Sequence, residues 1–247
     1  TGRLVVALKQ VLGSEVNILM YRNLFFDVDD TLLDFEAGEL KSLRATFEKH
    51  QIDYTDKLEK TYLRINAELW RQYEKGSITR EQIFYQRMRQ VFKQLGIAGD
   101  PEAVEKEYFT LVNRQAVLIP RVEATLEALR DYHLYIVSNG FESAQRYRLT
   151  KSHLIDYFDD IFVSDTIGAP KPSQAFFDYV AKRTPHFKPQ TSLIIGDSLT
   201  SDIQGGRNAH LDTAWFNPQF KANHGPIYST YTFNDFSDLL HIVNPIS

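Results

Sequence analysis

The sequence predicts an α/β fold, in which a parallel sheet is covered by helices and interrupted by one all-helical insert. Four apolar runs end in a small polar or acidic residue, as buried parallel strands do, and they occupy 23–30, 134–138, 160–164 and 192–197. Helical patterns separate the later runs, which favours a parallel sheet with crossover helices. Between 36 and 118 the strand-like runs give way to apolar residues at helical spacing, which indicates a helical insert.

The elements follow one another as a strand, the insert, and then alternating helices and strands. The first apolar run begins at Asn23 and leads directly into Asp27. After the insert, helical patterns cover 121–132, 142–152, 175–183 and 202–209, with the other three runs between them. We therefore expect a Rossmann-like core made of residues 20–35 and 119–247, with 36–118 as a separate helical domain.

Turn residues divide the insert into its helices. Gly76 and Thr79 stand between two helical patterns, and Thr79 lies where an N-cap of the second is expected. Gly96 and Pro101 mark a second break. At the other end of the chain, residues 1–19 precede Met20 and the first strand, so we expect an N-terminal extension. Met20 is then either the natural or alternative start, or an ordinary buried residue.

Composition excludes several classes of protein. At about 150 residues per domain, 247 residues make one large or two modest domains, and 43% hydrophobic with 24% charged residues is typical of a folded chain. The net charge of −4 does not favour a nucleic acid polymer as partner. Zero cysteines exclude disulfides, thiolate metal sites and cysteine nucleophiles. No run approaches the roughly 20 apolar residues of a membrane span, so we expect a cytoplasmic protein without a membrane partner.

Polar side chains capable of chemistry follow the predicted strands, where parallel strands share one crevice. The carboxylates are Asp27, Asp29, Asp197 and Asp202, and the other groups are Ser138, Asn139 and Lys171. Four negative charges in one cleft are unfavourable unless a cation or shared protons compensate them. A divalent ion is implied, and an all-oxygen ligand set favours Mg²⁺ over zinc. Lys171, the Ser138 hydroxyl and main-chain amides around Asn139 can bind an anion. A cation beside such donors indicates a phosphate ligand.

The order and spacing of these residues resemble the haloacid dehalogenase-like (HAD) hydrolases. The matching motifs are Asp27-Val-Asp29-Asp-Thr31, Ser138, Lys171, and Gly196-Asp197 through Asp202. Four motifs in order on strand ends are far more specific than a lone Asp-x-Asp pair. The resemblance implies that 36–118 is a C1-type cap, a lid that closes over the site and selects the substrate.

The same resemblance implies a role for each matching residue. Asp27 is the nucleophile that forms an aspartyl-phosphate, and Asp29 is the general acid and base. Mg²⁺ is held by the Asp27 carboxylate, the Asp29 carbonyl and Asp197. Ser138 and Lys171 bind the transferred phosphoryl group, with Asn139 beside them, and Asp202 belongs to the surrounding shell. Because related dehalogenases lack the second aspartate, Asp29 favours phosphoryl transfer.

A narrower resemblance concerns the substrate. Residues 65–80, 137–141 and 195–202 look like the branch of noncanonical pyrimidine nucleotidases, bacterial 5′-nucleotidases. This resemblance implies hydrolysis of nucleoside monophosphates, with uracil and thymine nucleotides as the first candidates. Ser138 departs from the threonine often found there, without loss of the hydroxyl. A small phosphate ester is thus the expected partner, for a monomer or homodimer.

Alternatives to this interpretation remain. A sugar-phosphate phosphatase or a phosphoglucomutase-like phosphotransferase would keep all four motifs and differ in the cap. A catalytically idle binding module would use the same fold, although it has no reason to keep the full set of charged residues. Taken singly, Asp27, Asp29 and Asp197 could be helix-capping residues. Trp70 and Tyr73, three residues apart on a helix, are expected to pack in the core of the cap rather than to stack on a base.

Overall fold

The computed structural model describes residues 21–244. The extension predicted over 1–19 and the expectation for Met20 lie outside the described residues. Within 21–244, no helix has the length and apolar character needed to cross a membrane.

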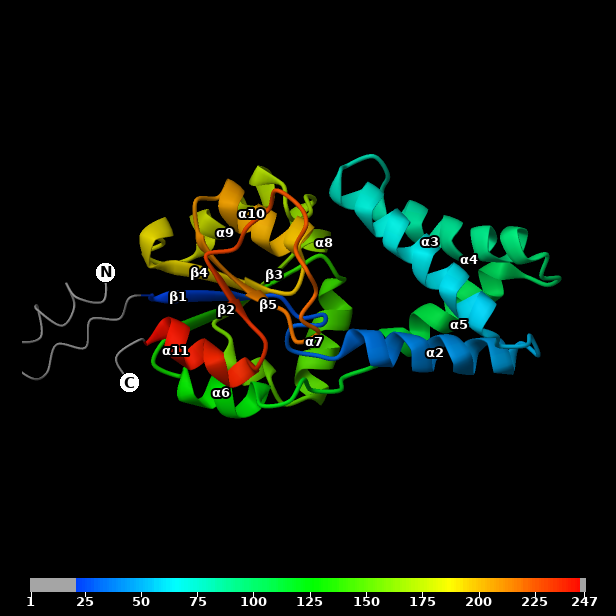
Figure 1. The fold of residues 1–247 in the computed structure, drawn as a ribbon, viewed down its shortest axis with the longest axis horizontal. Helices are drawn as coiled ribbons and strands as arrows, with labels where there is room; N and C mark the ends of the chain where they lie inside the picture. Colours follow the sequence, from blue (N-terminus) through cyan, green and yellow to red (C-terminus); the bar gives the residue numbers. More distant parts are fainter. Residues whose placement is uncertain (1–20, 245–247) are drawn as a thin grey trace, which may run out of the picture.

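A sheet of 6 parallel strands forms the centre of the core, in the order β3-β2-β1-β4-β5-β6 (Figure 1). The strands are β1 Asn23–Phe26, β2 His133–Ser138, β3 Asp160–Val163, β4 Ser192–Gly196, β5 Asp212–Phe216 and β6 Tyr231–Phe233. The four predicted strands are confirmed as β1 to β4, although β1 ends at Phe26, before the carboxylates. The sequence patterns missed β5 and β6, which are short and carry threonine among their apolar residues.

Helices cover both faces of this sheet because neighbouring side chains of a strand point to opposite faces. Leu24 and Phe26 of β1 belong to one apolar cluster, which includes residues of α6, α7 and α11. Phe25 belongs to the other, which includes residues of α9. The core helices are α6 Val122–Ala128, α7 Glu142–Lys151, α8 Ser164–Ile167, α9 Gln174–Arg183, α10 Gln204–Asn208 and α11 Leu239–Val243. The predicted α/β fold is therefore confirmed.

The last helix predicted from the pattern, 202–209, begins differently in the structure. Leu199–Ile203 forms a π-helical turn, and α10 starts only at Gln204. Local side-chain bonds explain the difference: Ser198 Oγ accepts from Ser201 N at 3.1 Å, and Asp202 Oδ2 accepts from Ser198 N at 3.1 Å. These bonds hold Asp202 against the end of β4 instead of on a regular helix.

The segment between β1 and α6 consists of four long helices with a core of their own. They are α2 Phe35–Lys49, α3 Asp56–Glu74, α4 Arg80–Leu95 and α5 Pro101–Val112. Leu43, Tyr62, Ile83 and Tyr108 are among the buried residues that these helices bring together. Figure 1 shows these helices beside the sheet, on the side away from the labelled chain ends.

The turn residues predicted for this segment act as expected. Thr79 caps α4 in a capping box with Gln82. Gly96 ends α4 with a φ of 66°, a left-handed conformation that favours glycine. Pro101 occupies the first turn of α5, where its missing N–H costs no hydrogen bond.

The two chain connections between the helical segment and the core run side by side. Asp34 N donates to Val117 O at 2.9 Å, and Ile119 N donates to Leu32 O at 3.0 Å. Away from these connections, the helices also contact the core through Arg80, whose Nη1 donates to Gly140 O at 2.6 Å. Paired connections of this kind place α2–α5 over the carboxyl ends of the strands.

We predict that Gly206→Ala lowers the free energy of unfolding by about 1–3 kcal/mol. A Cβ at Gly206 would lie 2.3 Å from Ile194 Cγ2 and 2.7 Å from Thr213 Cγ2, both on rigid strands of the sheet. Gly225→Ala is the matched control, because its Cβ would meet its nearest atom at 3.7 Å. Denaturant unfolding measures both; equal stability of the two variants would contradict the packing of α10 on the sheet.

Candidate functional site

The carboxyl ends of the strands open into a cavity of about 450 Å³ that also reaches α2–α5. Asp27 follows β1, Ser138 ends β2 and Asp197 follows β4, so adjacent strands bring distant residues together. All the site residues predicted from the sequence line this cavity: Asp27, Asp29, Ser138, Asn139, Lys171, Asp197 and Asp202.

Lys171 is the centre of the buried charges, and its side chain is only 1% exposed. Its Nζ donates to Asp27 Oδ1 at 2.7 Å, to Asp202 Oδ1 at 2.6 Å and to Val137 O at 2.8 Å. These acceptors use all three N–H bonds of the ammonium. The lysine is therefore fixed between the nucleophile candidate Asp27 and the carboxylate of Asp202.

One ammonium does not balance the carboxylates around it. Burial raises the pKa of Asp27 to about 8 despite the nearby Lys171, and Asp202 and Asp29 add to the rise. Burial and the carboxylates of Asp202, Asp27 and Asp30 also hold the pKa of Asp197 well above its usual range. Carboxylate oxygens of Asp27, Asp197 and Asp202 all lie within 4.8 Å of one another. A hard divalent cation such as Mg²⁺ fits this all-oxygen cluster, since it would offset the excess negative charge.

Asp202 approaches the end of β4 very closely because residue 196 is glycine. A Cβ at Gly196 would lie 2.2 Å from Asp202 Oδ2. Both carboxylate oxygens of Asp202 already accept hydrogen bonds, from Lys171 Nζ and from Ser198 N. The Asp202 carboxylate is therefore well placed to orient the Lys171 side chain.

Ser138 and Asn139 have different surroundings. Ser138 Oγ accepts from Gly140 N and from Gln145 Nε2, both at 3.0 Å, so its acceptor positions are filled and its O–H remains available to donate. Asn139 instead binds the main chain of Lys171: Oδ1 accepts from Lys171 N at 2.8 Å, and Nδ2 donates to Lys171 O at 3.0 Å. The Asn139 side chain therefore positions Lys171, while the Ser138 hydroxyl can reach a ligand.

Asp29 lies in the same cavity but outside the carboxylate cluster. Its Oδ1 forms an ion pair with Arg148 Nη1, and its Oδ2 accepts from Gln145 Nε2 at 2.9 Å. Arg148 is 2% exposed, donates through Nε to Gln115 O at 2.7 Å, and lies over the Phe35 ring. Arg148 thus contacts Asp29 and, through Phe35 and Gln115, both chain connections between the helical segment and the core.

Arg148 and Gln145 were not predicted from the sequence. The available signal is their spacing of three residues on the helix that follows Ser138, which places both polar side chains on its inner face. Such a pattern is also common on helices whose polar face is exposed to solvent. Only the fold shows that these two side chains face the site.

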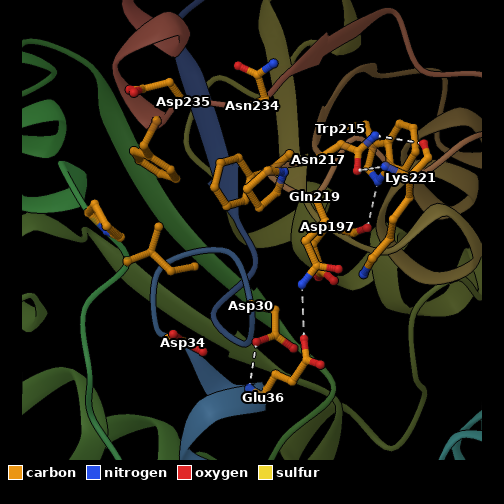
Figure 2. A pocket seen from close by; sticks show the side chains of 15 residues that line it. Asp30, Asp34, Glu36, Asp197, Trp215, Asn217, Gln219, Lys221, Asn234 and Asp235 are labelled. Atoms are coloured by element: carbon orange, nitrogen blue, oxygen red, sulfur yellow. Dashed lines mark hydrogen bonds between the residues drawn. The ribbon is translucent and has the colours of Figure 1, made fainter.

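A second cavity, of about 430 Å³, shares Asp30 and Asp197 with the first. Figure 2 shows Asp30 and Glu36 on one side of it and Asn234 and Asp235 on the other. Trp215 Nε1 donates to Asp197 O at 2.7 Å across this region. That bond fixes the main chain of Asp197, so β5 supports the site although it carries none of the predicted site residues.

The helical segment supplies an aromatic wall to the first cavity. Trp70, Phe84 and Phe109 line it from α3, α4 and α5, together with Phe141 from the core. The expectation that Tyr73 packs in the core of the helices holds, since it is 9% exposed. Trp70 differs from that expectation: it packs edge-on against Tyr73 and also faces the cavity.

Comparison with known proteins identifies relatives that span most of this chain. The family model described as haloacid dehalogenase-like hydrolase matches residues 21–210. HAD-hydrolase YfnB of Bacillus subtilis is 41% identical over 91% of this chain and 96% of its own length. The magnesium-bound crystal structure of YfnB superimposes on this chain with a TM-score of 0.85, and the match covers 91% of this chain and 99% of that one.

Two further relatives have names that state a substrate. Pyrimidine 5′-nucleotidase PynA of Streptococcus pneumoniae is 33% identical over 90% of this chain and 96% of its own length. Pyrimidine 5′-nucleotidase YjjG of Escherichia coli is 29% identical over 87% and 95%. The predicted resemblance and enzyme class are confirmed: this chain belongs to the haloacid dehalogenase-like hydrolases.

Proposed function

We propose that this hydrolase is a Mg²⁺-dependent phosphomonoesterase that cleaves nucleoside 5′-monophosphates, pyrimidine nucleotides first. The observation that carries the proposal is the cluster in which Lys171 joins Asp27 to Asp202, beside Asp197 and with Asp29 in the same cavity. It offers a nucleophile, a second carboxylate for proton transfer and a positive charge that attracts an anion. Relatives named pyrimidine 5′-nucleotidases support the choice of substrate.

The first chemical step would use the free oxygen of Asp27. Lys171 holds Oδ1, which leaves Oδ2 to attack phosphorus. A bond from Asp27 Oδ2 to phosphorus forms as the bond from phosphorus to the ester oxygen breaks. Asp29 gives its proton to that oxygen, and the nucleoside leaves as a neutral alcohol.

The second step would reverse the proton transfer. Asp29 takes a proton from water as the water oxygen bonds to phosphorus and the bond to Asp27 breaks, which releases inorganic phosphate. The Ser138 hydroxyl would donate to an oxygen of the phosphoryl group in both steps, and the buried positive charge of Lys171 would stabilise the negative charge of that group. Mg²⁺, held by the carboxylates of Asp27 and Asp197 and the Asp29 carbonyl, would neutralise charge on the phosphoryl group.

The helical segment would serve as the cap that selects the leaving group. It covers the cavity with Trp70, Phe84 and Phe109, and Arg80 fastens it to the loop that follows Ser138. Aromatic walls suit a flat base better than the many hydroxyls of a sugar, which favours a nucleotidase over a sugar-phosphate phosphatase or a phosphoglucomutase-like enzyme. The complete set of charged groups speaks against an idle binding module.

Asp27→Asn should lower phosphate release from uridine monophosphate by a factor of about 10³ or more, because an amide is a poor nucleophile. The measurement is Mg²⁺-dependent phosphate release, run on a panel of nucleoside monophosphates and sugar phosphates. Asp131→Asn is the matched control and should keep activity, because Asp131 is exposed on the surface of the Rossmann-like domain. Retained activity of Asp27→Asn would remove Asp27 from the nucleophile role.

Mg²⁺ should also raise the melting temperature of the protein without any substrate, by about 5 °C or more at 100-fold excess over Kd. The cation would relieve the repulsion among Asp27, Asp197 and Asp202 that burial intensifies. Asp197→Asn should lose this shift and Asp131→Asn should keep it. An equal shift in both variants would place the cation elsewhere.

Arg148→Met should impair hydrolysis of uridine monophosphate more than hydrolysis of p-nitrophenyl phosphate, whose leaving group needs no proton. Arg148 holds the carboxylate of Asp29, so its loss disturbs proton donation; we expect kcat/KM for the nucleotide to fall by about tenfold or more relative to the aryl ester. Arg146→Met, which removes a surface ion pair on the same helix, is the control. A uniform loss on both esters would show that Arg148 only supports the fold.

A further inference from the structure

The first cavity, of about 450 Å³, is lined by carboxylates at the strand ends and by several aromatic rings where it reaches the helical segment. The rings of Phe84, Phe109 and Phe141 lie 5.2–5.4 Å apart, centroid to centroid, and Trp70 lines the same space. Such faces bind flat aromatic groups by stacking, whichever base is present. This part of the cavity, called the aromatic chamber below, is continuous with the space beside Asp27 and Lys171.

Two buried charged side chains line the same cavity: Glu39 from α2 and Arg87 from α4, which are 6% and 3% exposed. The Arg87 guanidinium lies 5.3 Å from the centroid of the Phe84 ring, beside the aromatic chamber. Among residues 21–244, every hydrogen bond to the Glu39 carboxylate reaches Oε1. The donors are Asn66 Nδ2 at 2.8 Å and the hydroxyls of Tyr62 at 2.9 Å and Tyr108 at 3.2 Å. Oε2 therefore keeps its full capacity to accept a hydrogen bond from a ligand.

Arg87 is held in place to donate. Its Nε and Nη2 bind the carboxylate of Glu105, and its Nη1 donates to Asn66 Oδ1 at 3.0 Å. A guanidinium has five N–H bonds, so one on each terminal nitrogen has no hydrogen-bond partner among residues 21–244. Burial raises the pKa of Glu39, and the positive charge of Arg87 opposes that rise.

We propose that the aromatic chamber is the subsite for the pyrimidine base, with Glu39 Oε2 accepting the N3–H and Arg87 donating to the neighbouring carbonyl oxygen. Uracil and thymine present this donor beside this acceptor on one edge. Cytosine offers an amino donor beside a ring-nitrogen acceptor, which satisfies the same pair. The inference rests on the proposed nucleotidase function and adds the residues that recognise the leaving group.

The first test needs no variant. Wild-type enzyme is assayed with uridine monophosphate and with 3-methyluridine monophosphate, whose N3 carries a methyl group in place of the proton. Loss of a hydrogen bond to a buried carboxylate should lower kcat/KM for the methylated nucleotide by about tenfold or more. Equal kcat/KM values for the two nucleotides would overturn the assignment of Glu39.

The second test changes the acceptor. Glu39→Gln should lower the ratio of kcat/KM for uridine monophosphate to that for ribose 5-phosphate, which has no base, by about tenfold. It should also reduce the discrimination against 3-methyluridine monophosphate. Glu48→Gln, at an exposed position of the same helix, is the matched control and should leave both ratios unchanged. An equal loss on the nucleotide and the sugar phosphate would assign Glu39 to the fold alone.

The two proposals fail in different ways. If the wild-type enzyme releases phosphate from other esters but not from pyrimidine nucleotides, the proposed substrate is wrong and the base subsite falls with it. If it hydrolyses uridine monophosphate and ignores the methyl group at N3, the nucleotidase function stands and only the subsite is overturned.

Discussion

The site depends on one buried interaction, the ammonium of Lys171 shared between Asp27 and Asp202. A buried lysine or aspartate is costly alone, and breaking such a pair leaves an uncompensated charge. Much of the local structure supports this contact: Asn139 holds the Lys171 main chain, and Gly196 leaves room for Asp202. The remaining negative charge, shared with Asp197, would favour the binding of a cation.

The sequence allowed much of this to be predicted because buried parallel strands leave a strong local pattern. Runs ending at Asp27, Ser138 and Asp197 identified the strand ends, and the topology of parallel sheets places strand ends in one crevice. Strand β5 was missed because five residues with Thr213 and Ala214 make a weak run, yet its Trp215 holds Asp197. Short strands acquire their structure from neighbours rather than from their own pattern.

Residues that act through tertiary contacts were not predictable in the same way. Arg148 and Glu39 look like ordinary charged positions on helices, and only packing shows that one holds Asp29 while the other faces a cavity. Trp70 was expected in the core of the helices, and it is half-buried there while one part lines the cavity. Helical spacing identifies an inner face, but it does not distinguish a core from a binding wall.

The proposed mechanism requires a covalent bond between Asp27 and phosphorus, and the most direct measurement captures that intermediate. Borohydride added during turnover of uridine monophosphate with Mg²⁺ reduces an aspartyl-phosphate to homoserine, which peptide mass spectrometry can locate. The account predicts homoserine at position 27, dependent on substrate and on Mg²⁺. An unmodified Asp27 under turnover, or modification at Asp29 or Asp197 instead, would contradict it.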